Sequence, residues 1–113
     1  MANKVTPTPY FENKYKKLSK KFPSLGSELL NLENELKENP TLGESLGANI
    51  YKVRIASKDK GKGKSGGFRI ITYLVHEVKN SIEIFLITIY DKSEESSISI
   101  SSLKKIVKMI FGY

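Results

Sequence analysis

Six side chains between residues 52 and 92 could act together on a phosphate group: Lys52, Arg54, Lys64, Arg69, Tyr90 and Lys92. Most of them fall on segments that are predicted to be neighbouring strands. Because antiparallel strands lie about 4.8 Å apart, side chains on one face converge on an area of one or two nucleotides. Cations there can stabilise the charge of a phosphorane, while the ribose 2′-hydroxyl supplies the nucleophile. The group predicts a site that can cleave RNA without a metal or cofactor and that is inert on DNA.

The charge of the chain is concentrated around these residues. The 113 residues include 19 basic and 12 acidic side chains, for a formal charge of +7, and the basic excess is greatest over residues 52–69. A positive face favours a polyanionic partner. We expect four lysines of this block, Lys64 among them, to bind the phosphates of RNA without base preference: Lys58, Lys60, Lys62 and Lys64.

Several other classes of site are excluded. The chain has no cysteine and a single histidine, His76, so it has neither thiolate nor all-histidine metal sites. Gly63-Lys64-Ser65 is similar to the end of a phosphate-binding loop, but Lys58 stands where that loop needs glycine and a strand follows at Phe68. No apolar run is long enough to span a membrane, and the amino terminus lacks a signal peptide, so we expect a cytoplasmic protein.

The first half of the chain is predicted to hold a short extended segment and two helices. Residues 4–8 are extended, and Pro7 confines them to a sheet edge. Thr8 and Pro9 then form a typical helix start. Two apolar stripes with helical spacing follow, separated by Pro23: Phe11, Tyr15, Leu18 and Phe22, then Leu25, Leu29, Leu32 and Leu36. We expect Ser24 or Ser27 to cap the second helix.

The second half is predicted to supply a sheet that covers this α-hairpin. Residues 49–57 alternate, with Tyr51, Val53 and Ile55 on one face and Ile50, Lys52 and Arg54 on the other. Strands over 68–75 and 82–90 follow, the last one central because it is apolar on both faces. A helix after the serine-rich segment 96–102 ends the chain. The prediction is one α+β domain over 1–113, with an N-terminal α-hairpin on a small twisted antiparallel sheet and a C-terminal helix.

The sequence resembles the RelE/ParE superfamily of bacterial type II toxins, and most closely the RelE- and HigB-like branch. The likeness covers nearly the whole chain. Four segments carry it: Phe11-x-x-x-Tyr15-Lys16-x-Leu18, Tyr51-Lys52-Val53-Arg54-Ile55, Lys62-Gly63-Lys64-Ser65-Gly66-Gly67-Phe68-Arg69-Ile70-Ile71-Thr72-Tyr73, and Ile89-Tyr90-Asp91-Lys92. The resemblance implies a toxin that cuts mRNA in the ribosomal A site and that a cognate antitoxin neutralises.

The same resemblance implies roles for the site residues. Arg69 matches the arginine at the scissile phosphate, Lys52 and Arg54 match the basic strand that holds the RNA backbone, and Lys92 falls where relatives place a further cation. Relatives often carry a catalytic Tyr or His after the last long strand, whereas residues 93–102 contain neither. This departure leaves Tyr90 or Lys52 as the candidate base.

Two other functions remain open at this stage. One is a ParE-like inhibitor of DNA gyrase, which would have no chemistry of its own, and the other is an RNA-binding domain without activity. The cations beside Arg69 favour the nuclease, with mRNA, the ribosome and an antitoxin as partners and no membrane. We expect the fold to tolerate the loss of Arg69, because no buried apolar contact would be removed.

Overall fold

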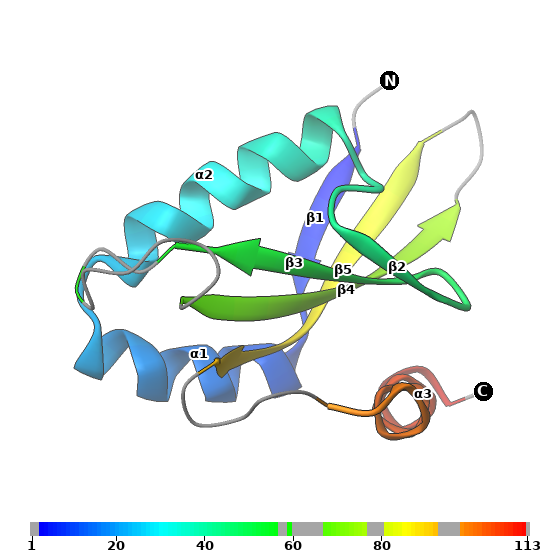
Figure 1. Ribbon diagram of the computed structural model, residues 1–113. Coiled ribbons are helices and arrows are strands. Elements are labelled where there is room, and N and C mark those ends of the chain that lie inside the picture. The colour runs from blue at the N-terminus through cyan, green and yellow to red at the C-terminus, as the bar shows by residue number, and fades with distance from the viewer. Residues whose placement is uncertain (1–2, 57–58, 60–66, 77–80, 93–97, 113) are drawn as a thin grey trace.

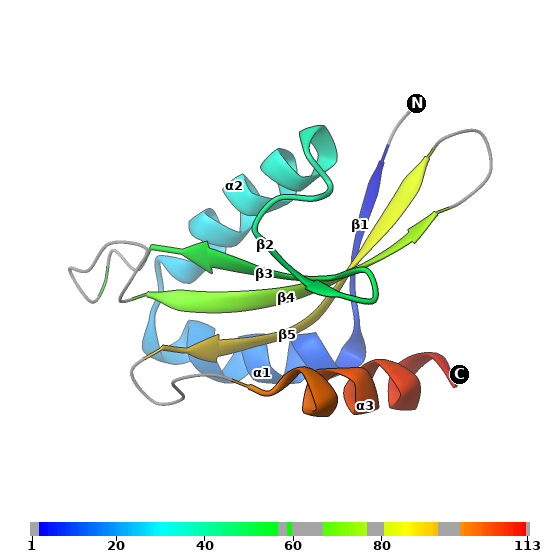
Figure 2. The same ribbon diagram turned by 45° about the vertical axis from the view of Figure 1, so that its right-hand side comes forward.

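The computed structural model describes residues 3–56, 59, 67–76, 81–92 and 98–112. Its elements follow the order β1 (Lys4–Pro7), α1 (Pro9–Lys21), α2 (Leu25–Glu38), β2 (Glu44–Gly47), β3 (Ile50–Ile55), β4 (Phe68–His76), β5 (Ile82–Asp91) and α3 (Ile100–Phe111). The five strands form one sheet in the order β1-β5-β4-β3-β2. Figures 1 and 2 show α1 and α2 on one side of this sheet and α3 on the other. The expected α+β class, with an α-hairpin on the sheet and a C-terminal helix, is confirmed.

Two hydrophobic clusters hold the layers together, one on each face of the sheet. The first joins Phe11 of α1 and Leu25, Leu32 and Leu36 of α2 to the sheet. The second joins Leu103 and Val107 of α3 to the opposite face. Val53 and Ile55 lie in the first cluster and Ile50 in the second, so the predicted faces of β3 are confirmed. We call the face that carries α3 the α3 face.

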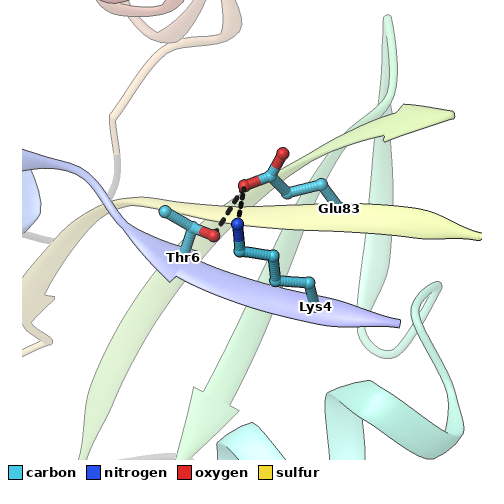
Figure 3. Close-up of polar contacts among 3 residues, drawn as sticks. All are labelled: Lys4, Thr6 and Glu83. Carbon is cyan, nitrogen blue, oxygen red and sulfur yellow. Dashed lines mark hydrogen bonds and ion pairs between the residues drawn. The ribbon is translucent and has the colours of Figure 1, made fainter. Parts of the chain in front are cut away.

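The expectation of a purely antiparallel sheet is wrong at one edge. β1 pairs with β5 in parallel, whereas β2, β3, β4 and β5 pair antiparallel in turn. Thr6 Oγ1 donates a hydrogen bond of 2.7 Å to Glu83 Oε2, and Lys4 Nζ lies 3.8 Å from the same oxygen. Figure 3 shows both β1 side chains reaching this one carboxylate on β5. The edge strand is thus fixed by side chains as well as by its backbone.

The helix starts follow the sequence signals in part. Thr8 Oγ1 accepts from the N–H of Phe11 at 3.2 Å and donates to the carbonyl of Leu86 at 2.8 Å, so the cap of α1 also anchors that helix to β5. Ser99 Oγ accepts from the N–H of Ser102 at the start of α3. In α2, Ser24 is the N-cap residue but its side chain caps no N–H of the helix. The expected position of the N-cap at Ser24 is therefore confirmed, but the serine hydroxyl does not make the capping hydrogen bond.

A β-bulge in β5 changes which of its side chains face α3. Ile71 pairs with Thr88 but Thr72 pairs with Leu86, which leaves Ile87 as an extra residue. Leu86 and Ile89 both lie in the cluster under α1 and α2, although they are three positions apart, an odd number that strict alternation would place on opposite faces. Strict alternation would place Tyr90 on the side of Leu86. The bulge moves Tyr90 to the α3 face instead.

Candidate functional site

Three of the predicted site residues form a row across the α3 face. Arg54 on β3 pairs with Arg69 on β4, and Arg69 pairs with Tyr90 on β5. Directly opposite residues in a sheet share a face, and their Cα atoms lie about 4.5–5.5 Å apart. The structure therefore brings two guanidinium groups and one phenol side by side, as the sequence predicts.

Arg69 lies at the centre of this row and is only 3% exposed. Its Nη1 donates a hydrogen bond of 3.3 Å to the carbonyl of Phe68. Burial lowers the pKa of Arg69 from its ordinary value, and the charge of Arg54 lowers it further, while Tyr90 raises it. A guanidinium still stays protonated at neutral pH. The row thus holds a permanent positive charge in a poorly hydrated position, where a phosphate group would relieve the repulsion.

This burial changes one expectation about Arg69. The sequence suggests that the fold would tolerate its loss, but a side chain that is 3% exposed fills space in the protein interior. Removing it would leave a cavity next to the aromatic ring of Tyr90 and the α3 cluster. A lysine, which keeps charge and most of the volume, is the more informative substitution.

Tyr90 is 4% exposed and belongs to the cluster that packs under α3, together with Leu103 and Val107. The ring therefore takes part in holding α3 on the sheet. Any substitution of Tyr90 affects this packing as well as the chemistry of the row. Arg54, in contrast, is exposed at the edge of the row and can be reached from solvent.

Lys52 lies on the same face as Arg54, two residues along β3, and pairs with Glu44 of β2, which belongs to no sequence motif. Its Nζ lies 3.6 Å from Glu44 Oε1, and the two residues stand opposite each other on β3 and β2. The Glu44 side chain is 62% exposed and that of Lys52 is 25% exposed. The site thus includes a carboxylate at its rim.

Of the remaining predicted site residues, the structure describes Lys92 but not the four lysines between β3 and β4. Lys92 directly follows β5, and its N–H donates a hydrogen bond of 3.1 Å to the carbonyl of Gly67, next to the start of β4. The four proposed RNA-binding lysines, Lys58, Lys60, Lys62 and Lys64, lie outside the described residues. Among the described residues, no group of three or more His, Cys, Asp or Glu side chains could hold a metal ion. No described helix has the length and apolar character to cross a membrane.

One described residue within the basic block makes a specific contact outside the α3 face. Asp59 Oδ2 accepts hydrogen bonds from the N–H of Ser24 at 2.8 Å and from Ser24 Oγ at 2.6 Å. Asp59 is the only acidic residue in 52–69. It ties this segment to the start of α2, where an acidic side chain is favoured by the exposed N–H groups of the helix.

Together, these observations define a class of protein: a small α+β domain whose sheet carries two adjacent arginines, one of them buried, beside a tyrosine. Comparison with known proteins identifies the family. The family model for the RelE toxin of the RelE / RelB toxin-antitoxin system matches residues 10–112. The chain therefore belongs to the RelE toxin family and is a type II toxin, and this membership implies an antitoxin as its partner.

A solved structure supports the same fold. The chain is similar to a mutant of the E. coli toxin RelE in its free state, with a TM-score of 0.61 and 18% sequence identity. The match covers 98% of this chain and 100% of the other. At this level of identity the likeness extends to the fold alone.

Proposed function

We propose that this toxin is a ribosome-dependent mRNA endoribonuclease that acts in the cytoplasm by metal-independent attack of the ribose 2′-hydroxyl. The observation that best supports this proposal is the row of Arg54, Arg69 and Tyr90 on neighbouring strands. A buried guanidinium beside an exposed one suits a phosphate whose negative charge grows during the reaction. Membership of the RelE toxin family is consistent with this activity.

In the proposed reaction, the 2′-hydroxyl oxygen attacks the adjacent phosphorus and the bond to the 5′ oxygen breaks. The 2′-hydroxyl proton passes to a base, and the 5′ oxygen takes a proton as it leaves. Arg69 would hold two phosphate oxygens through its planar fork and stabilise the phosphorane. Arg54, Lys52 and Lys92 would hold the flanking backbone, and the lysines at 58, 60, 62 and 64 would contact further phosphates.

We assign the proton acceptor to the rim of the site. The sequence leaves Tyr90 or Lys52 for this role, but the Tyr90 ring packs among the apolar side chains of the α3 cluster. Glu44 is exposed, stands beside Lys52 and carries a carboxylate, a group that can serve as a general base. Lys52 then acts as the cation that orients Glu44, and Tyr90 positions Arg69.

The test is cleavage of mRNA on translating ribosomes by the unaltered chain and by Arg69→Lys and Glu44→Gln variants. We expect site-specific cleavage that both variants slow, with Arg69→Lys retaining RNA binding because it keeps the charge. A parallel assay uses gyrase and supercoiled DNA. Inhibition of gyrase without cleavage of mRNA would replace this proposal with a ParE-like function, and RNA binding without either effect would leave a non-catalytic domain.

A further inference from the structure

A small pocket lies on the α3 face, away from the row of Arg54, Arg69 and Tyr90. Its volume is about 170 Å³. Pockets that hold a whole small ligand measure about 300–1,000 Å³, so this one suits a single group of a larger partner. Figures 1 and 2 show the turn between β2 and β3 beside α3. This turn, β3, β4 and α3 all line the pocket: Ala48, Ile50, Tyr73, Lys104, Val107 and Lys108.

The floor of the pocket is apolar and includes an aromatic ring. Ile50 and Val107 are buried and belong to the cluster under α3. Tyr73 stands directly opposite Ile50 and packs against the same cluster, yet it is only half-buried. Its ring centroid lies 5.2 Å from that of Phe111, so the ring is held in place from the side of α3. A fixed, partly exposed aromatic ring can stack against a base of single-stranded RNA.

The rim of the pocket is positive. Lys104 and Lys108 are four residues apart on α3, so their side chains lie on one side of the helix. Both are exposed, and among the described residues neither ammonium group has a hydrogen-bonding or ionic partner. Residues 98–113 contain no acidic side chain. The pocket therefore combines an aromatic floor with two cations, which matches a base and the phosphates beside it.

The pocket also continues the row along the strands. Ile50 lies four residues from Arg54 on β3, and Tyr73 lies four residues from Arg69 on β4. At about 3.4 Å per residue, each separation is about 14 Å. Lys52 lies between the two places on the same face. A single strand of RNA with a phosphate at Arg69 can therefore run past Lys52 and reach the pocket.

We propose that this pocket binds one base of the RNA strand whose phosphate lies at Arg69. The base would stack on Tyr73, while Lys104 and Lys108 would hold the neighbouring phosphates. This inference rests on the proposed function, because it names a further contact of the same RNA strand. Stacking accepts every base, so the pocket would fix the position of the strand more than it would select a sequence.

The experiment measures binding of the full chain to a short single-stranded RNA whose 2′-hydroxyls are methylated, so that it cannot be cleaved. Fluorescence anisotropy gives the affinity for this RNA and for a series in which one base at a time is missing. We expect the loss of one particular base to weaken binding by about 5-fold or more, as the loss of a stacked base does. This effect should disappear in Tyr73→Leu and persist in Tyr73→Phe, which keeps the ring.

A lysine pair with a matched control tests the rim. The double variant Lys104→Gln and Lys108→Gln should reduce the magnitude of the slope of log affinity against log salt by about 1.4, since each phosphate contact on a single strand contributes about 0.7. Lys105→Gln removes an exposed cation of the same helix that does not line the pocket. It should leave the slope unchanged. These variants alter exposed residues, so they test the inference even where Tyr73→Leu does not fold.

Several results would overturn the inference. They are no binding of the RNA, equal losses along the whole series, a series in Tyr73→Leu that matches the unaltered chain, and equal slopes for the lysine pair and Lys105→Gln. Weaker antitoxin binding by the pocket variants with unchanged RNA binding would also overturn it and would assign the pocket to a protein partner.

Cleavage of mRNA on translating ribosomes is measured separately with the unaltered chain. Absence of cleavage together with the expected base effect at Tyr73 would count against the proposed function alone. Cleavage without that base effect would count against the pocket alone.

Discussion

Replacing Arg54 with glutamine should make this protein more stable while it weakens the proposed activity. Arg54 stands directly opposite Arg69 on the neighbouring strand, and Arg69 is 3% exposed. Like charges directly opposite each other in a sheet are destabilising. Glutamine removes the charge of residue 54 and keeps a long polar side chain at an exposed position, so the substitution relieves the repulsion without opening a cavity.

The expected magnitude follows from the geometry. Two unit charges about 6 Å apart repel by about 0.7 kcal/mol in water and by about 3 kcal/mol at an effective dielectric constant of 20. Because Arg54 is exposed, the lower part of this range applies, and measured cross-strand pairs are worth about 0.2–1 kcal/mol. A gain of about 0.5–1 kcal/mol should raise the Tm of a domain of this size by about 2–4 °C.

The assay is thermal unfolding followed by circular dichroism at low and at high salt. Salt should raise the Tm of the unaltered chain more than that of Arg54→Gln, because salt screens a repulsion that the variant lacks. Lys52→Gln is the matched control, since it removes a cation from the same face that attracts Glu44 at 3.6 Å. It should lower the Tm. A fall in Tm for Arg54→Gln as large as that for Lys52→Gln would refute the reasoning.

Three further predictions concern the site and the basic block. Arg69→Ala should reduce the rate of mRNA cleavage by about 10²–10³-fold, as the loss of other transition-state donors does. Arg69→Lys should cleave more slowly than the unaltered chain yet still bind RNA in a filter assay. Full cleavage by Arg69→Ala would show that this residue does not belong to the site. RNA affinity should fall steeply between low and physiological salt, with similar contributions from Lys58, Lys60 and Lys62, and a flat profile would count against this segment as an RNA contact. Asp59→Ala should lower the free energy of unfolding in urea by about 0.5–2 kcal/mol through the loss of its bonds to Ser24, and an unchanged midpoint would contradict that role.

The elements that the sequence predicts correctly are those with a strong local signal. Thr8 and Pro9 mark the start of α1, and the structure uses Thr8 as the cap. The alternation over β3 predicts that Arg54 lies on one face of the sheet and that Val53 and Ile55 lie on the other face, as observed. These features depend on neighbours in the chain, so a single sequence contains the information that determines them.

β2 was missed because its signal is not local. The strand has only four residues, of which Leu46 is the one apolar side chain, and its partner is β3. The turn that joins the two strands has positive φ at both Ala48 and Asn49, a geometry that usually selects glycine or asparagine. Alanine is rare at such a position, so the sequence carries little indication of the turn. Without β2, the carboxylate of Glu44 could not be placed beside Lys52.

The bulge in β5 could not be predicted for a similar reason. The run from Ile82 to Tyr90 is almost continuously apolar, so it contains no alternation that an extra residue would visibly interrupt. The sequence did place Tyr90 with the basic residues, but only the extra residue at Ile87 brings Tyr90 to the face of Arg69. Bulges are frequent where a strand must re-aim a functional side chain.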